Sequence, residues 1–145
     1  MKIEQKERGF LTKEELKSIE DLSSSIERLV VVKDLFLFSC YTGISHSDII
    51  ELTSDNIVTG IDVHPWIMAD RIKTGTPFKI PLLSKAAILI DKYKEHIRTY
   101  DTDSLLPKLS NQKLNNFLKE ISDLCGIKKN LPFIWPDIRL PLPLP

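Results

Sequence analysis

The sequence has few cysteines, few glycines and no long uninterrupted apolar run, and each shortage excludes a class of protein. The apolar stretch at residues 29–38 is broken by Lys33 and Asp34, whereas a membrane-spanning helix needs roughly 20 apolar residues. We therefore expect no membrane contact. The two cysteines, Cys40 and Cys125, do not suggest a disulfide framework, and we expect both to be free thiols on helices.

Recognisable metal, cofactor and triad motifs are also missing. The five glycines form no Gly-rich phosphate loop, and no Ser-His-Asp pattern stands out. The histidines, His46, His64 and His96, lack metal-ligand spacing relative to cysteines or carboxylates. We therefore expect neither a cofactor nor a bound metal. Residues 1–8 are charged and have no apolar segment typical of a secretory signal, which predicts a cytoplasmic location.

The formal net charge is zero, which by itself does not favour a strongly basic nucleic-acid-binding domain. The charge is nevertheless divided unevenly along the chain. Residues 1–70 hold 7 Lys or Arg against 13 Asp or Glu, a net charge of −6, whereas residues 71–145 hold 13 against 7, a net charge of +6. This asymmetry predicts a basic, phosphate-binding face in the second half, although lysines on solvated helix faces produce the same pattern.

The first third of the chain is predicted to be helical. The 145 residues, 42% of them hydrophobic, can enclose one core, so we expect one domain. Thr12 and Glu15 form a capping box for a first helix. Ser24 and Glu27 repeat this spacing before a strongly apolar, buried central helix that ends at Gly43.

A short helix and a small sheet are predicted next. Ser45, with Asp48 in the first turn, is the expected cap of a helix that runs through Leu52. Glycines and prolines then punctuate residues 56–83. This pattern predicts three antiparallel strands at residues 56–58, 66–71 and 78–82, with the last turn at residues 73–76.

Helical spacing returns in the second half. Ser84 is predicted to cap a helix with an apolar face formed by Ala87, Ile88, Ile90, Tyr93 and Ile97. After a polar connector, Ser110 is predicted to cap a final helix that Gly126 ends. Its buried face should carry Leu114, Phe117, Leu118, Ile121 and Leu124. The expected fold class is mainly α (α+β), a helical domain with a small three-stranded antiparallel sheet.

Four stretches, taken in order, resemble the catalytic domain of the tyrosine recombinases, the phage integrase family, and especially the integrases of bacterial mobile elements. They are F-L-T-K-E-E-L, L-F-L-F-S-C-Y-T-G-I-S-H-S-D-I-I-E-L, R-I-K-T-G-T-P-F-K-I-P-L-L and L-P-K-L-S-N-Q-K-L-N-N-F-L-K-E-I. The resemblance extends from Phe10 to Leu131. It implies that residues 1–131 form a partial recombinase catalytic domain, with a function in DNA integration and recombination.

The resemblance also implies specific site residues. Family members cut DNA with a tyrosine that becomes covalently linked to phosphate, while two arginines, a lysine and a histidine or its equivalent stabilise the charged phosphorane and handle protons. Lys73 matches the family's hairpin lysine, although by itself it is an ordinary exposed turn lysine. Ser45 stands where the first family arginine follows T-G-x, and serine lacks the charge and bidentate fork of arginine. A helix N-cap is its alternative role.

The resemblance stops after Leu131. The family continues with a segment such as T-F-H-L-A-R-H-T-F-A-T-T-V-T, which carries the second arginine, and later with a histidine or tryptophan and the nucleophilic tyrosine. This chain instead reads P-F-I-W-P-D-I-R-L-P-L-P-L-P, which a single-base deletion in suitable codons for the family segment reproduces. We interpret residues 132–145 as a frameshifted Leu/Pro-rich tail on a truncated domain. Arg139 is then not the catalytic arginine, and Tyr41, Tyr93 and Tyr100 precede the nucleophile's place.

The resemblance leaves weak binding to duplex DNA, without strand cleavage, as the expected function. The residues expected to contact phosphates are Arg71, Lys73, Thr74 and Lys79 around the hairpin turn, and Lys113 and Asn115 early in the final helix.

Two other interpretations stay open. Residues 45–52 could form the recognition helix of a non-enzymatic DNA-binding or regulatory module, although Asp48 and Glu51 make this segment acidic. Alternatively, the chain could be a protein-interaction fragment that forms a homo-oligomer through apolar surface exposed by truncation.

Overall fold

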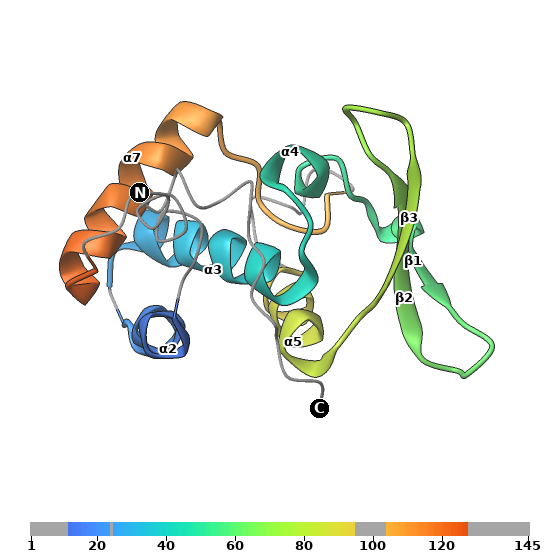
Figure 1. Ribbon diagram of the computed structural model, residues 1–145, viewed down its shortest axis with the longest axis horizontal. Helices are drawn as coiled ribbons and strands as arrows, with labels where there is room; N and C mark the ends of the chain where they lie inside the picture. Colours follow the sequence, from blue (N-terminus) through green and yellow to red (C-terminus); the bar gives the residue numbers. More distant parts are fainter. Residues whose placement is uncertain (1–11, 24, 95–103, 128–145) are drawn as a thin grey trace, which may run out of the picture.

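A buried helix and a three-stranded sheet organise the described part of the chain (Figure 1). The structure is a computed structural model and describes residues 12–23, 25–94 and 104–127. The helices are α2 (Lys13–Asp21), α3 (Glu27–Thr42), α4 (His46–Ile49), α5 (Ser84–Tyr93) and α7 (Asn111–Cys125), with a 3-10 turn, η1 (Ser54–Asn56). The strands are β1 (Ile57–Thr59), β2 (Pro65–Asp70) and β3 (Pro77–Pro81). The predicted mainly α fold with a small antiparallel sheet is confirmed.

Local signals begin and end several helices as the sequence predicts. The Thr12 side chain accepts the Glu15 N–H at 3.1 Å, and the Glu15 carboxylate accepts the Thr12 N–H at 2.9 Å, so the capping box is confirmed. The Ser110 side chain caps the first turn of α7. Gly43 and Gly126 end α3 and α7 with φ angles of 78° and 71°, a left-handed conformation that glycine adopts without steric cost.

Two other helices begin at positions that differ from the predicted caps. Helix α3 begins at Glu27 with Ile26 at the N-cap position, and the predicted capping box of Glu27 with Ser24 depends on a residue that lies outside the described residues. Leu83, not Ser84, is the N-cap of α5, without a side-chain bond. Both helices bury apolar side chains against the core, and this burial stabilises their positions.

The sheet is an antiparallel meander with the order β1-β2-β3. Ile67 in the middle strand pairs with Ile57 on one side and Ile80 on the other. Alternation along β2 buries Ile67 completely and leaves the next side chain, Met68, 44% exposed. The sheet is therefore covered on one face only. Each observed strand lies one residue away from its predicted position.

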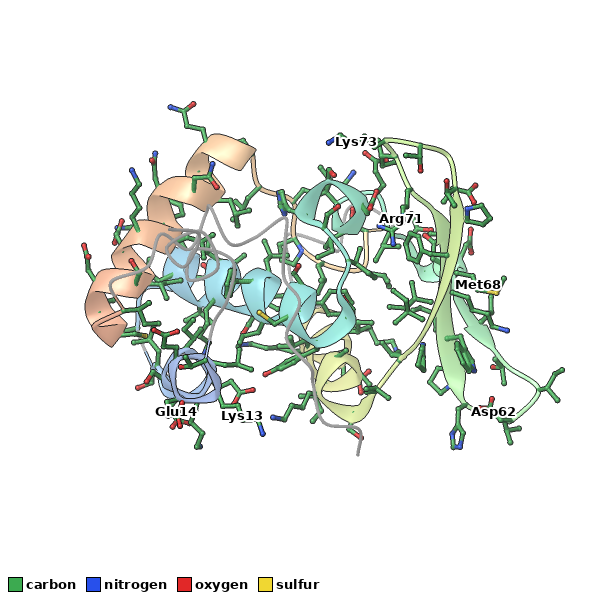
Figure 2. The ribbon with its side chains drawn as sticks, viewed as in Figure 1. Lys13, Glu14, Asp62, Met68, Arg71 and Lys73 are labelled. Atoms are coloured by element: carbon green, nitrogen blue, oxygen red, sulfur yellow. The ribbon has the colours of Figure 1, made fainter. Side chains whose placement is uncertain are left out.

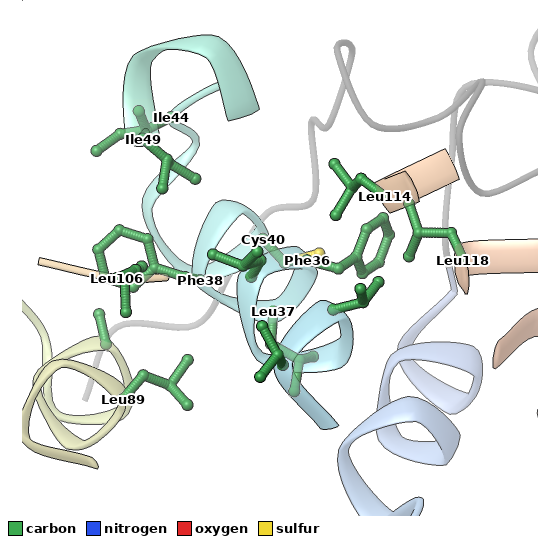
Figure 3. Close-up of a cluster of buried hydrophobic side chains, with 14 of the residues drawn as sticks. Phe36, Leu37, Phe38, Cys40, Ile44, Ile49, Leu89, Leu106, Leu114 and Leu118 are labelled. Carbon is green, nitrogen blue, oxygen red and sulfur yellow. The ribbon is translucent and has the colours of Figure 1, made fainter. Parts of the chain in front are cut away.

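Helix α3 lies at the centre of the core and contacts α2, α4, α5 and α7. Figure 3 shows Phe36 of α3 beside Leu114 and Leu118 of α7, and Phe38 on the side of Leu89 and Leu106. Both phenylalanines are fully buried. The predicted buried central helix is confirmed, and Cys40 within it is a buried free thiol. Cys125, at the end of α7, is a partly buried free thiol, as predicted.

The apolar faces predicted for α5 and α7 are only partly correct. In α5 the buried residues are Ala86, Leu89 and Tyr93, whereas Ile88 is 64% exposed. In α7, Leu124 is 59% exposed although the prediction placed it on the buried face. Consecutive apolar residues leave several possible faces, and packing against α3 selects one of them. The predicted helical continuation to Ile97 lies outside the described residues.

A buried carboxylate joins α3 to α5. Asp34 is 2% exposed, and one of its oxygens accepts hydrogen bonds from Lys92 Nζ at 2.6 Å and from the Tyr93 hydroxyl at 2.5 Å. Two donors, one of them cationic, offset part of the cost of removing the carboxylate from water. This cluster therefore holds α5 in register against α3.

Candidate nucleic-acid interface

Helix α4 connects the hairpin turn to the helical core. Its Asp48 is 6% exposed, and Oδ1 accepts the backbone N–H of Ile72 at 2.8 Å. Ile72 lies in the turn between β2 and β3, directly before Lys73. The hydrogen bond therefore fixes the base of this turn beside α4 and sets where Lys73 begins to project.

Ser45 lies beside the same carboxylate. Its hydroxyl donates to Asp48 Oδ2 at 3.0 Å and lies 3.2 Å from the hydroxyl of Ser47. Ser45 occupies the N-cap position of α4 but makes no side-chain cap bond. Ser45 is thus at the predicted N-cap position, but its side chain does not make the predicted capping bond, and its hydroxyl is oriented toward the buried Asp48 carboxylate instead. The position carries no cation.

The β2–β3 turn presents Lys73 at its tip (Figure 2). The turn is closed by hydrogen bonds from Arg71 N–H to Thr76 O at 2.9 Å and from Gly75 N–H to Arg71 O at 2.7 Å. Thr74 donates its hydroxyl proton to Thr76 Oγ1 at 2.9 Å. Lys73 and Thr74 are exposed. The turn is thus ordered by its own contacts and projects a cation into solvent.

Arg71 and Lys79 lie on opposite faces of the hairpin. The Arg71 guanidinium lies 5.4 Å from the ring centroid of Phe78, a half-buried residue on the core side. Lys79, the next residue along, pairs with Met68, and its ammonium lies 4.8 Å from the Trp66 ring centroid. The structure therefore does not bring Lys79 together with the other basic residues expected at DNA.

The start of α7 is joined to α4 by a histidine. His46 is 4% exposed, and its Nε2 lies 3.2 Å from the carbonyl oxygen of Leu109. Burial lowers the pKa of His46, and the hydrogen bond to Leu109 opposes this shift only in part. The next residue, Ser110, accepts the N–H of Lys113 on its side-chain oxygen at 3.2 Å. His46 thus contacts the chain just before the helix that carries Lys113.

Three segments distant in sequence therefore meet along one edge of the molecule. The β2–β3 turn, α4 and the start of α7 lie in a row along the top of Figure 1, with α4 in the middle and bonded both to the turn and to Leu109, which lies just before α7. Lys113 and Asn115 are exposed in the first turns of α7. We call this row of segments, which carries the exposed residues Lys73 and Thr74 on the turn and Lys113 and Asn115 on α7, the basic edge. Arg71 lies at its border, at the base of the turn.

Sequence reasoning missed the role of two residues in this arrangement. In the sequence, His46 was considered only as a possible metal ligand, and Asp48 as support for a helix start and as an acidic residue of a possible recognition helix. Their partners, Leu109 and Ile72, are 63 and 24 residues away in the chain. The sequence offers only a histidine directly after the predicted cap Ser45, and it contains no indication of the carbonyl group that accepts its hydrogen bond.

The two described tyrosines lie in other environments. The Tyr41 hydroxyl donates to Glu20 at 2.6 Å, and desolvation followed by this hydrogen bond raises its pKa. Tyr93 is 1% exposed and its hydroxyl bonds to Asp34. Both hydroxyls therefore join core helices to one another, and neither is available to attack a phosphate. Tyr100 and the Leu/Pro-rich tail at residues 132–145 lie outside the described residues.

A recognition helix at residues 45–52 does not fit the structure. Helix α4 contains four residues, and three of them, His46, Asp48 and Ile49, are buried. A recognition helix must instead project several side chains into the major groove. This segment holds its neighbours together and cannot enter a groove.

Comparisons with known proteins do not assign the chain to a family. No protein-family profile matches it, and no curated protein matches it in sequence. Within residues 12–23, 25–94 and 104–127, no group of three His, Cys, Asp or Glu side chains is placed to hold a metal ion. None of the helices in these ranges is both long and apolar enough to span a bilayer.

Proposed function

We propose that this chain is a fragment of a site-specific DNA recombinase that binds duplex DNA weakly through phosphates and does not cleave it. The observation that carries the proposal is the basic edge, where α4 holds the β2–β3 turn through Asp48 and the start of α7 through His46. The resemblance of Phe10 to Leu131 to tyrosine recombinases independently points to DNA as the partner.

Exposed cations on two separate elements suit a phosphate backbone. Lys73 and Lys113 are both exposed and lie on two segments that α4 bonds on either side of itself. Each contact between a lysine and a phosphate releases condensed counterions, which makes the slope of log K against log salt more negative by about 0.9. Thr74 and Asn115 add neutral donors. Such contacts position a protein on DNA without selecting a base sequence.

Weak binding follows from the small number of cations. The chain as a whole carries no net charge, and Ser45, at the place of a family arginine, has its hydroxyl bonded to Asp48. With two contacts from Lys73 and Lys113, or three if Arg71 contributes, a rise from 50 to 200 mM salt weakens binding by about 10- to 40-fold. We expect measurable affinity only at low ionic strength.

The proposal excludes strand cleavage by this chain. No arginine occupies the T-G-x position, and residues 132–145 do not match the family segment that carries the second arginine. The hydroxyls of Tyr41 and Tyr93 are bonded to buried or half-buried carboxylates of the core. A covalent adduct between DNA and any tyrosine of this chain would overturn this part of the proposal.

The experiment compares DNA binding by the intact chain and by two double variants at 50 and 200 mM salt. The first is Lys73→Ala with Lys113→Ala, which removes both lysines of the basic edge. The second is Lys13→Ala with Lys17→Ala, which makes the same change in net charge on α2, at the opposite side of the molecule (Figure 2).

The basic-edge variant should lose about tenfold in affinity at 50 mM salt, from two exposed contacts of about 0.5–1 kcal/mol each. The slope of log K against log salt should become less negative by about 1.8, because two phosphate contacts are lost. The α2 variant should bind nearly as well as the parent chain. Equal losses in the two variants would mean that only net charge matters, and no binding by the parent chain at 50 mM salt would refute the proposal.

A further inference from the structure

We infer that His46 is a positioning residue for the basic edge, because it sets the start of α7, and with it Lys113, relative to the β2–β3 turn. The inference rests on the proposed DNA-binding function for its consequence. Its structural part can be tested without DNA.

The contact of His46 is specific in its chemistry. A carbonyl oxygen only accepts hydrogen bonds, so the 3.2 Å contact with Leu109 O requires a proton on Nε2 of His46. The ring is 4% exposed, so water cannot easily replace this contact. Because Leu109 directly precedes the N-cap Ser110, the imidazole orients the peptide unit from which α7 starts.

The rest of the connector has anchors of its own. Leu105 donates its N–H to Leu52 O at 3.1 Å, and Thr53 and Ser104 form an isolated antiparallel bridge. Leu105 and Leu106 are buried in the core. Loss of the His46 contact should therefore leave the connector attached and the chain folded, and should release only its last residues before α7.

The hairpin side of the basic edge does not depend on His46. Asp48, two residues further along α4, holds the turn through Ile72 N–H. The two contacts leave the same short helix in different directions. A change at His46 should therefore disturb the contribution of Lys113 to DNA binding and spare that of Lys73. A merely destabilising change would weaken both.

A double-mutant cycle tests this asymmetry. His46→Leu removes the donor but keeps an apolar side chain in the buried position, and His46→Gln keeps an N–H donor. Binding to a mixed-sequence duplex at 50 mM salt is measured for each variant alone, with Lys113→Ala and with Lys73→Ala.

In the His46→Leu background, Lys113→Ala should cause less than a twofold further loss, while Lys73→Ala keeps the full loss that it causes in the parent chain. His46→Gln should restore the effect of Lys113→Ala. Tyr93→Phe, which removes a buried hydrogen bond between α3 and α5, serves as a control for general destabilisation and should leave both lysine effects unchanged. A full effect of Lys113→Ala in His46→Leu overturns the inference.

Amide hydrogen exchange separates this inference from the proposed function. The N–H groups of Lys113 and Leu114 bond to the side chain and carbonyl of Ser110, so they report the first turn of α7. In His46→Leu these two amides should exchange at least tenfold faster, while the Ile72 amide keeps its parent rate. Unchanged exchange at Lys113 and Leu114 refutes the positioning role even if the parent chain binds DNA. Faster exchange in a chain that does not bind DNA supports the positioning role of His46 and refutes the proposed DNA-binding function.

Discussion

Asp48 bonds α4 to the β2–β3 turn, and removing its carboxylate should show how much this contact contributes to the free energy of unfolding. Asp48→Ala deletes the acceptor for Ile72 N–H, a 2.8 Å bond at a side chain that is 6% exposed. A hydrogen bond to a charged acceptor contributes about 1.5–3 kcal/mol. The second partner, Ser45, is half-buried and can rebind water, so its loss adds little. We therefore expect a loss of about 2–3 kcal/mol in the free energy of unfolding.

Urea unfolding followed by circular dichroism measures this loss. With an m-value of about 2 kcal/mol/M, the unfolding midpoint should fall by about 1–1.5 M. Asp48→Asn keeps an acceptor oxygen for Ile72 N–H and should recover more than half of the loss. A midpoint for Asp48→Ala within about 0.2 M of the parent value would refute the reasoning, because the contact would then contribute nothing net. Equal losses in the two variants would show that the charge matters, not the acceptor.

Three further predictions concern buried groups elsewhere. Burial lowers the pKa of His46 from its ordinary value of 6.5. The contribution of neutral His46 to stability is therefore fully present above pH 6.5 and declines as the pH falls, because the unfolded chain then binds a proton that the folded chain does not. Urea midpoints of the parent chain should fall more between pH 7 and 5.5 than those of His46→Gln, and parallel curves for the two proteins would contradict this. Tyr93→Phe removes one hydrogen-bond donor from buried Asp34. The free energy of unfolding, measured in urea, should fall by about 1.5–3 kcal/mol. A loss under about 0.5 kcal/mol would mean that Lys92 alone satisfies the carboxylate. Burial raises the pKa of the Cys40 thiol to about 12. A thiol reagent at pH 8, with labelling detected by mass spectrometry, should therefore modify Cys125 in the native protein and Cys40 only in denaturant. Rapid labelling of Cys40 in the native protein would refute its burial.

The sequence predicted best the features that depend on residues close together in the chain. The capping box at Thr12 and Glu15, the Ser110 cap, and the glycine stops at Gly43 and Gly126 all form within one helical turn. Strand positions were correct to one residue, because turn residues mark the ends of strands locally. The fold class follows from these elements together.

Predictions that depended on the choice of a partner were less accurate. In α5, Ile88 is exposed and Leu89 is buried, because contact with α3 decides which side of the apolar run at residues 86–90 faces inward. Ser45 shows the same limit on a smaller scale. A capping motif was present in the sequence, but its hydroxyl bonds to the Asp48 carboxylate, which the tertiary contact with Ile72 holds in place.

For the candidate site, the sequence by itself determined which side chains are available: Lys73 in a turn, Lys113 early in a helix, and no cation at Ser45. Only the tertiary structure decided which of them lie along one edge and that Lys79 faces away. The physical reason is chain separation. Hydrogen bonds such as His46 to Leu109 and Asp48 to Ile72 join residues 63 and 24 positions apart, and they form only because burial of the core repays the entropy of closing the intervening loops.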